Sequence, residues 1–464
     1  MSGPQIFRVP LSLVEGRLDP LYYFSVNNLA LTKKTKYPVK RLADVIDMQR
    51  GRFGHRPRND PRFYDGAYPF IQTGDVVQAS LTDGQISYSQ TLNELGLKTS
   101  RLFDKPVVVL TIAANIGDTA ILDYPACFPD SLIGMSPKSA EISLEYINLY
   151  FKFIKEYLNN LAPQSAQKNI NYQQLAPVPI VVPPIHVQKT ATEIYKNALK
   201  QKAKNDTEVQ TLLNGVNILL YQHLGIEPLT NQSDRLDQRI FKMRLSQFEG
   251  RFDPHFYKII YQELMEKVIS KPHKRLNSLC SFSKEIWDGF SGFEVEFPYL
   301  EISDIDLSSG HITALKKNLI NEAPSRARMK VRHGDFLVSL TRPNRGAITR
   351  SNNEHPALFI ASTGFAVLRD VAPEIQPEYL LYVLRSHIVL DQFEQRSSGG
   401  NYPAITEEEM GRVLIPLPNQ KVQHLIVNEI SAIYCQAKAL HQQAQFFLAQ
   451  AKQRVEKMIL GADQ

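Results

Sequence analysis

The sequence predicts an α+β protein built from two tandem copies of one unit, with a long α-helix at the end of each copy. Two observations carry this prediction. The chain repeats itself at an offset of 234 residues, and in each copy a region of short β-rich runs and one helix precedes a stretch almost free of Pro and Gly. We expect the two long helices to pair as an antiparallel coiled coil and the copies to be related by a pseudo-twofold axis.

Length and composition agree with a globular protein that has a sizeable core. The chain has 464 residues, of which 43% are hydrophobic and 22% charged, and its net charge of +6 permits a polyanionic partner without requiring one. Cys127, Cys280 and Cys435 are too few and too far apart for a disulfide framework or a zinc site. We expect all three to be buried thiols in a reducing compartment, and no metal site.

The N-terminus gives no sign of export or of membrane insertion. Residues 1–10 lack the apolar stretch of a signal peptide, and no uninterrupted apolar run reaches eighteen residues. We therefore expect a cytoplasmic protein that does not bind a membrane.

The repeat starts at a segment that we call the strap, residues 6–23 in copy one and 240–257 in copy two. Glu15-Gly16-Arg17-Leu18-Asp19-Pro20 returns as Glu249-Gly250-Arg251-Phe252-Asp253-Pro254, and we expect this sequence to form a structural turn. At an offset of 229, Asn115-Ile116-Gly117 matches Asn344-Arg345-Gly346. The repeat predicts a first globular domain at 1–185, a central long helix at 186–235, a second globular domain at 236–420 and a C-terminal long helix at 421–464.

Within each globular domain the same order of elements is expected. Short runs rich in β-branched residues predict strands, and one longer stretch predicts a helix. The strands are expected at Val107–Ile112, Val178–Val182, Phe336–Leu340 and Val413–Leu417, and the helices at Leu144–Leu161 and Pro377–Phe393.

The long helices are expected from Gln188 to Leu224 and from Gln423 to Leu460, since prolines lie just before each stretch. In the second, apolar residues alternate spacings of four and three, as in the seam of a coiled coil. The central stretch follows this pattern less well, because Lys202 and Asn205 fall on its seam. Two unrelated core helices remain the alternative. The predicted C-terminal seam is Ile426, Ile430, Ile433, Ala437, Leu440, Ala444, Phe447 and Ala451.

No catalytic motif is found in the sequence. It contains no phosphate-binding loop, dinucleotide fingerprint, zinc-protease helix or nucleophile elbow. Asp19-Pro20-Leu21-Tyr22 and Asp253-Pro254-His255-Phe256 resemble the D-P-P-[YF] of amino-methyltransferases, but their third residue is not Pro and no glycine-rich turn for the methyl donor accompanies them. We therefore expect a chain without catalytic residues.

The sequence does contain arginine-rich loops that are candidate binding sites. Copy one has a basic loop from Arg50 to Arg58, and copy two has basic residues from Arg326 to Arg332 and again from Arg342 to Arg345. Arg binds guanine through two parallel hydrogen bonds, Asn pairs with adenine, and further cations neutralise phosphates. A solvated basic loop without a ligand is the alternative for each. The candidate DNA-binding residues are Arg50, Arg52, Arg56, Arg58, Asn115, Lys168, Arg326, Arg328, Arg342, Asn344, Arg345 and Asn401.

The order and duplication of these motifs resemble the specificity (S) subunit of type I restriction-modification enzymes over the whole chain. Each copy leaves its globular domain through a Pro-rich strand, then has a Gln (Gln188 or Gln423) and a helix. Ser397-Ser398-Gly399-Gly400-Asn401-Tyr402 is similar to the late glycine-rich loop of the family, and Gly334-Asp335-Phe336 to the start of one of its strands. Copy one departs from that pattern, with Lys105-Pro106 in place of the Gly-Asp.

The resemblance implies a non-catalytic DNA-recognition subunit. Each copy would be a target recognition domain that reads one half of a bipartite site in double-stranded DNA. The paired helices would set the spacer between the halves and dock two methyltransferase (M) subunits, and a restriction and translocase (R) subunit would join for cleavage. S-adenosylmethionine, Mg and ATP would belong to those partners, with no cofactor in this chain. A subunit serving a fused methyltransferase-nuclease, or a two-lobed protein-binding scaffold, remains an alternative.

Overall fold

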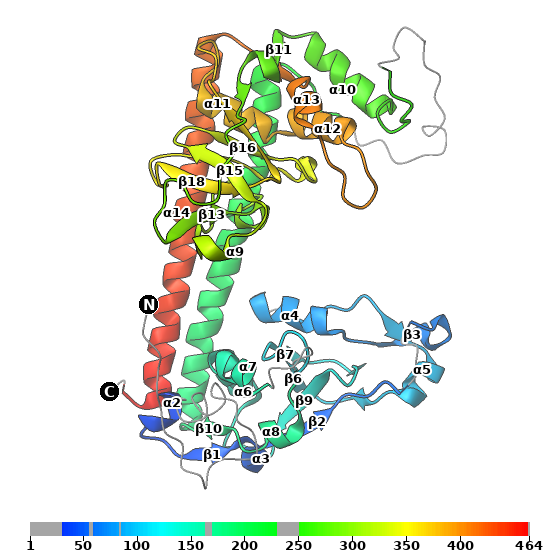
Figure 1. Ribbon diagram of the computed structural model, residues 1–464. Helices are drawn as coiled ribbons and strands as arrows, with labels where there is room; N and C mark the ends of the chain where they lie inside the picture. The colour runs from blue at the N-terminus through cyan, green and yellow to red at the C-terminus, as the bar shows by residue number, and fades with distance from the viewer. Residues whose placement is uncertain (1–29, 55–58, 83–84, 163–168, 230–249, 463–464) are drawn as a thin grey trace. The chain divides into compact units, whose positions relative to one another are not determined.

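A computed structural model describes residues 30–54, 59–82, 85–162, 169–229 and 250–462 (Figure 1). The chain divides into two compact units. Unit 1 comprises the chain up to Thr207 and from Leu440 onward, and unit 2 runs from Glu208 to Ala439. Both units mix helices and sheets, which confirms the predicted α+β class. In the described part of the chain, no helix has the length and apolar character needed to cross a membrane.

Unit 1 is built on an antiparallel sheet with strand order β2-β9-β6-β7. Successive side chains of β6 point to opposite faces of this sheet. Val108 and Leu110 join the core that contains α6 and α7, whereas Val107 and Val109 join the core that contains α4. Helices therefore cover both faces of the sheet. The elements are α2 (Ala30–Lys33), β1 (Val39–Arg41), α3 (Leu42–Val45), β2 (Ile46–Arg50), β3 (Tyr64–Pro69), α4 (Thr73–Thr82), β4 (Thr91–Leu92), α5 (Glu94–Thr99), β5 (Leu102–Phe103), β6 (Val107–Thr111), β7 (Thr119–Leu122), β8 (Ala126–Cys127), β9 (Leu132–Pro137), α6 (Leu144–Phe153), α7 (Lys155–Leu161), α8 (Tyr172–Leu175) and β10 (Pro179–Val181).

Unit 2 has a sheet of equivalent strand order, β12-β19-β16-β17, and a second four-stranded sheet, β14-β13-β18-β15. Phe336 and Val338 of β16 pack in the core with α11 and α12, whereas Leu337 packs with Val331 and Phe359 of the second sheet. The elements are α10 (Ile259–Ile269), β11 (His273–Arg275), β12 (Ser281–Phe282), β13 (Glu296–Leu300), β14 (Lys316–Leu319), β15 (Ala327–Arg332), β16 (Phe336–Ser339), β17 (Ile348–Arg350), β18 (Leu358–Ser362), β19 (Phe365–Arg369), α11 (Pro377–Leu384), α12 (His387–Arg396), α13 (Glu407–Gly411) and β20 (Leu414–Pro416).

A two-stranded sheet closes each unit beside the start of a long helix. Lys40 of β1 pairs with Ile180 of β10 in unit 1, and Lys274 of β11 pairs with Ile415 of β20 in unit 2. The hydroxyl of Tyr146 donates to the carbonyl of Val181 at 2.9 Å, and that of Tyr379 to the carbonyl of Pro416 at 2.8 Å. We call the elements and contacts that recur in both units the framework.

Two buried glutamines complete the framework. The Gln188 side chain accepts from the Ser143 backbone N–H at 2.9 Å and donates to the carbonyls of Glu141 and Pro183 at 2.7 and 2.8 Å. Gln423 accepts from Gln376 at 2.9 Å and donates to the carbonyls of Glu374 and Pro418 at 3.0 and 2.9 Å. Each glutamine thus ties the start of its long helix to the segment before α6 or α11.

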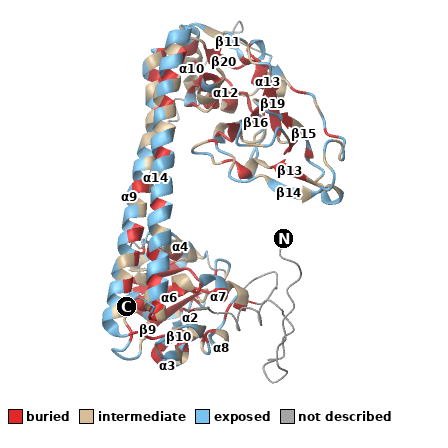
Figure 2. Cartoon of the chain, turned by 90° about the vertical axis from the view of Figure 1, so that its left-hand side faces the viewer, coloured by how far each residue is buried: buried red, intermediate tan, exposed pale blue. Residues whose placement is uncertain are grey.

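The long helices are α9 (Ile185–Leu224) and α14 (Gln420–Leu460). They run antiparallel within each unit, because the first half of α9 shares a core with Val455 and Ile459, and its second half shares one with Ile426 and Ile430. Both end at a glycine with positive φ, Gly225 at 60° and Gly461 at 70°, a conformation that glycine adopts without steric cost. Figure 2 shows that much of their remaining surface is exposed.

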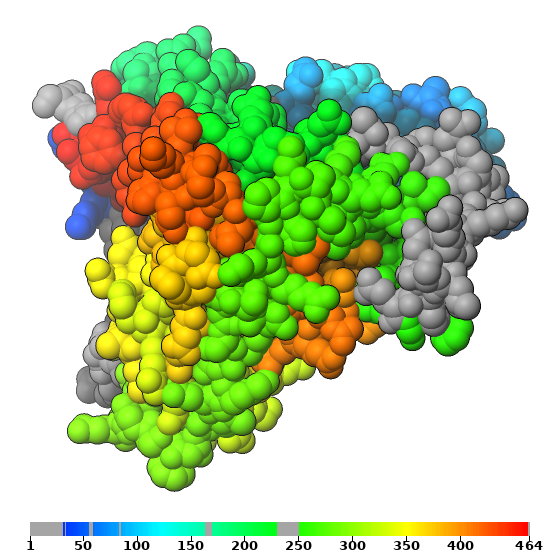
Figure 3. All heavy atoms as spheres, turned by 90° about the horizontal axis from the view of Figure 1, so that it is seen from above, coloured from blue at the N-terminus to red at the C-terminus, as the bar shows by residue number. Residues whose placement is uncertain are grey.

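The helix α10 packs beside the chain that follows α9. Lys267 of α10 donates to the carbonyls of Glu227 and Pro228, each at 3.3 Å. Figure 3 shows these green segments side by side.

The coiled-coil seam matches the prediction with one exception. Ile426, Ile430, Ala437, Ala444 and Ala451 are buried and Ile433 and Leu440 partly buried, but Phe447 is 39% exposed. The small side chains of Ala198 and Ala451 leave a groove there, and Phe447 lines it. Asn205 is buried in α9, and its side-chain amide donates to the Leu440 carbonyl at 3.2 Å. This bond accommodates a polar residue on the seam.

Two other expectations were wrong in part. The helix predicted at Leu144–Leu161 is interrupted at Ile154, and that predicted at Pro377–Phe393 is interrupted at Arg385–Ser386. In both pairs the two helices bury apolar side chains in one core, so the bend serves packing. Cys127 and Cys280 are buried as expected, whereas Cys435 is exposed because it lies on α14 outside the seam.

Candidate nucleic-acid interface

The arginines of unit 1 gather where β2 ends. Arg50 is the last residue of β2, and its Nε donates to the Asp130 carbonyl at 2.5 Å. Arg101, which the sequence analysis missed, donates from Nη1 to the Arg50 carbonyl at 2.5 Å. Arg52 is exposed, and its carbonyl accepts from the Ser100 hydroxyl at 2.7 Å. Arg101, which is distant in sequence, therefore shares one surface with Arg50 and Arg52.

Close packing explains the glycine between Arg50 and Arg52. A Cβ on Gly51 would lie 2.3 Å from the Pro129 carbonyl oxygen, a distance that no side chain tolerates. Glycine thus lets this strand end rest on the Phe128–Pro129 turn.

Of the remaining candidate residues of unit 1, the structure describes Asn115. Asn115 is exposed on the loop after β6, and Ala113 of that loop pairs with Asn169. Asn115 thus lies on a loop that meets the chain next to Lys168. Arg56, Arg58 and Lys168 themselves lie outside the described residues.

In unit 2, two loops that the sequence analysis singled out lie in direct contact. We call residues Arg342–Arg345 and Ser398–Tyr402 the tip. The Arg342 guanidinium donates from Nε and Nη2 to the Asn401 carbonyl at 3.2 and 2.7 Å, and it stacks on the Tyr402 ring with Cζ 4.1 Å from the centroid. Ser398 pairs with Ala404, which also pairs with Thr341. Two of Arg342's hydrogen-bond donors are therefore used within the protein.

The backbone of the tip is held firmly. Arg342 adopts φ 49° and ψ 51°, a left-handed conformation that costs about 1 to 2 kcal/mol for a residue with a Cβ. Arg385, at the break between α11 and α12, donates to the carbonyls of Gly346 and Ile348 at 3.1 and 3.0 Å. Asn344 lies between these anchored ends, and Arg345 is exposed.

Arg326 and Arg328 lie elsewhere in unit 2, at the start of β15. Both are exposed, and Arg328 donates from Nε to the Ser325 carbonyl at 3.3 Å. The neighbouring Trp287 is fully buried and donates its backbone N–H to the Arg328 carbonyl at 2.6 Å. Among the described residues, no hydrogen bond or ion pair joins these arginines to the tip, so they form a basic group separate from it.

Ion pairs distinguish structural cations from free ones. Arg369 bonds Asp335 through two hydrogen bonds of 2.8 and 2.7 Å, which raise the pKa of the Arg369 guanidinium. Arg332 pairs with Glu285 at 2.5 Å. Among the residues that the structure describes, no carboxylate pairs with Arg52, Arg326, Arg328 or Arg345. These four cations remain available to an anionic ligand.

The described part of the second strap copy, residues 250–257, forms the expected turn at Asp253. The Asp253 carboxylate accepts from the His255 backbone N–H at 3.0 Å, and Phe256 is buried with the guanidinium groups of Arg251 and Arg396 over its ring at 4.7 and 5.3 Å. This aromatic ring is therefore not free to face a base. The first copy of the strap lies outside the described residues.

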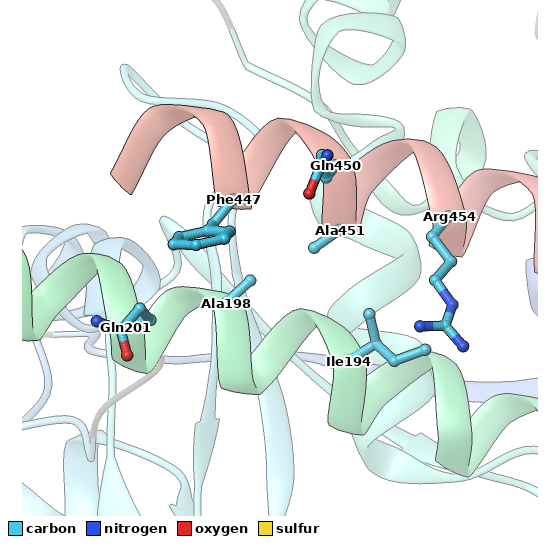
Figure 4. Close-up of a pocket in the computed structure, with 7 residues that line it drawn as sticks. All are labelled: Ile194, Ala198, Gln201, Phe447, Gln450, Ala451 and Arg454. Carbon is cyan, nitrogen blue, oxygen red and sulfur yellow. The ribbon is translucent and has the colours of Figure 1, made fainter. Parts of the chain in front are cut away.

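A groove of about 380 Å³ opens between α9 and α14 in unit 1 (Figure 4). Ala198 and Ala451 form its floor, while Phe447 and Arg454 stand at its two ends along α14. Ile194, Gln201 and Gln450 complete the lining. The groove offers an apolar surface beside a cation.

Three of these residues could not be assigned from sequence. Arg385 has no other Lys or Arg within ten residues, and Arg101 is flanked by Lys98 and Lys105 but by no second arginine, so no arginine-rich loop marks either of them. Tyr402 lies within the quoted glycine-rich motif, but only the contact with Arg342 singles it out.

The sequence of unit 1 matches a known protein family. Residues 34–212 match the family model described as the type I restriction modification DNA specificity domain. This stretch is therefore similar to a DNA specificity domain, which agrees with the resemblance inferred from the motifs.

Solved structures of specificity subunits are also similar to this chain at low identity. The S subunit of a type I restriction-modification system from M. genitalium is 10% identical with a TM-score of 0.45, covering 93% of this chain and 97% of that one. The HsdS subunit from Thermoanaerobacter tengcongensis is 16% identical with a TM-score of 0.35, covering 92% and 97%. A chain from a study of complex assembly and conformational transition of the type I R-M system is 16% identical with a TM-score of 0.45, also covering 92% and 97%.

Proposed function

We propose that this protein is the DNA-recognition subunit of a type I restriction-modification complex and that each unit reads one half of a bipartite site. The observation that carries the proposal is the framework. The Gln188 contacts of the unit with the family match recur around Gln423 in unit 2. A second unit with the same framework is expected to perform the same task on a second DNA segment.

The unpaired arginines supply the binding chemistry of this proposal. Arg52 in unit 1, and Arg326, Arg328 and Arg345 in unit 2, are exposed cations that suit phosphates and guanine edges. Asn115, Asn344 and Asn401 are the candidates for adenine contacts. Arg50 and Arg342 each use guanidinium donors inside the protein, so we assign them first to shaping the surface.

The long helices are proposed to set the spacer. A helix of 40 residues such as α9 is about 60 Å long at 1.5 Å per residue, comparable to about 18 base pairs at 3.4 Å each. Such a length suits two half-sites about one helical turn apart.

The groove between α9 and α14 is proposed as part of the docking surface for the two M subunits. Its apolar floor and Arg454 offer contacts typical of protein interfaces. The chain itself is proposed to be non-catalytic. The M subunits would supply S-adenosylmethionine chemistry, and the R subunit, with Mg and ATP, would supply cleavage.

Methylome sequencing tests the proposal. Cells that produce the chain with a methyltransferase subunit of a type I system that binds it should acquire adenine or cytosine methylation at a motif of two fixed halves and an unspecified spacer. A continuous motif made with a fused methyltransferase-nuclease would support that alternative. If the purified complex binds no DNA, the result would favour the alternative in which the chain is a protein-binding scaffold.

A further inference from the structure

Tyr402 occupies an unusual place for a large aromatic side chain. It is 71% exposed at the end of the glycine-rich loop Ser398–Tyr402, whereas most aromatic side chains of unit 2 are buried in its cores. Because burial of apolar area stabilises a protein, an exposed ring lacks the stabilisation that a buried one contributes. A ligand that covers the ring would recover this stabilisation.

The ring is held in position before any ligand binds. Arg342 stacks on one face at 4.1 Å, and its two hydrogen bonds to the Asn401 carbonyl fix the guanidinium next to the ring. The residue nevertheless stays 71% exposed, so most of its surface is open to solvent. Fixing the side chain in advance lowers the entropy cost of binding through it.

The charges around the ring favour a polyanion with flat, stackable groups. The tip contains Arg342 and Arg345 and no Asp or Glu. Asn344 and Asn401 add amides that suit base edges. Aromatic rings next to arginines stack on nucleic-acid bases, and apolar wedges that enter a groove unstack a base-pair step.

We propose that Tyr402 is an aromatic wedge that stacks on one base-pair step of the half-site read by unit 2, and that Arg342 is the positioning residue that holds it. This inference rests on the proposed function and specifies how one half-site is read. In unit 1 the repeat places Ala113 at the position of Arg342 and Ile170 at the position of Tyr402, so neither the arginine nor the tyrosine has a counterpart there. The wedge therefore acts on one half-site only.

A selection experiment tests the wedge. The full chain, assembled with its M subunit, selects duplexes from a random double-stranded library, and bound sequences are read for Tyr402→Ala, Tyr402→Phe and unchanged protein. Tyr402→Ala should weaken binding to the best duplex about tenfold and relax the preference at one two-base step, since stacking on an aromatic side chain contributes at this scale. Tyr402→Phe, which keeps the ring, should retain the step preference. Phe290→Ala controls for loss of an exposed aromatic in the same unit, because Phe290 is 66% exposed.

The choice of step is itself a prediction. Pyrimidine–purine steps unstack most easily, so the relaxed position should be one of these. A 2-aminopurine base placed at that step should brighten when unchanged protein binds and stay dim with Tyr402→Ala.

Arg342→Lys separates positioning from charge. Lysine keeps the positive charge but lacks the planar fork that bonds Asn401, so the same step should lose its preference. Adding Tyr402→Ala to Arg342→Lys should cost little more than Tyr402→Ala alone, because both changes remove one wedge.

The outcomes separate this inference from the proposed function. If unchanged protein selects no motif, the proposed function fails. If it selects a bipartite motif and Tyr402→Ala selects the same motif with the same affinity, the wedge is wrong while the proposed function stands. Relaxation spread evenly over both half-sites would also overturn the wedge, since it would indicate general misfolding.

Discussion

The two units keep the same inner contacts and differ in what covers the other face of their central sheets. Gln188 and Gln423 form matching sets of hydrogen bonds, and Tyr146 and Tyr379 close matching two-stranded sheets. Opposite that framework, unit 1 places α4 on its sheet, whereas unit 2 places a second sheet there. A shared framework can therefore support two unrelated outer surfaces.

The cations follow the variable parts of the units. In unit 1, Arg50, Arg52 and Arg101 meet at the end of β2. In unit 2, Arg342 and Arg345 occupy the loop after β16, where unit 1 has Ala113 and Ile116. This difference is expected if the two units read different half-sites, as proposed.

Lengthening both long helices should have the largest effect on the sites that are methylated. Inserting seven residues after Asn205 and seven after Ala439 preserves the seam and adds about 10 Å, equivalent to about three base pairs. Methylome sequencing should show the two original half-sites with a wider spacer. An insertion in α9 alone is the control, and it should disrupt pairing with α14. The original spacer at full activity would show that the helices only tether the units.

Removing the framework glutamines should destabilise the protein most among single changes. Gln188→Ala and Gln423→Ala each delete three hydrogen bonds and leave buried backbone groups unpaired, so each should lower the free energy of unfolding by about 2 to 4 kcal/mol. Urea unfolding monitored by circular dichroism measures this. The exposed Gln436 of α14 provides the control, and Gln436→Ala should change stability little. Markedly unequal losses would contradict a framework of equal importance in both units.

Single arginine changes should separate the two half-sites. Arg52→Ala should weaken binding through one half-site, and Arg345→Ala through the other, each by about 1 to 3 kcal/mol if the arginine reads a base. Fluorescence anisotropy with duplexes altered in one half at a time measures the effect. Arg412, which pairs with Glu408 at 2.6 Å, is the matched control. Equal loss on both halves from either variant would count against independent reading.

The framework could be predicted from the sequence because the same contacts occur in both units and require the same residue types in both copies of the repeat. Gln188 and Gln423, and the glycines after both long helices, recur since their hydrogen bonds and positive φ angles recur. The covering elements could not be predicted from a repeat, because unit 1 has a helix, α4, where unit 2 has a second four-stranded sheet.

The candidate interface was predicted less completely than the framework. The sequence motifs identified Arg342 and Asn401 as candidates. They did not predict that two hydrogen-bond donors of Arg342 bind the Asn401 carbonyl. Arg101 reaches Arg50 across 51 residues of chain, a contact that depends on tertiary packing alone. The burial of Asn205 likewise depends on the Leu440 carbonyl of the partner helix.

Exchange of one unit tests the central claim most directly. Residues 1–185 would be replaced by the corresponding region of a related specificity subunit, and the methylated motif of the exchanged chain would be sequenced beside that of the original. Independent units predict that one half-site changes while the other half and the spacer stay the same. A motif altered in both halves, or unaltered in both, would contradict the account.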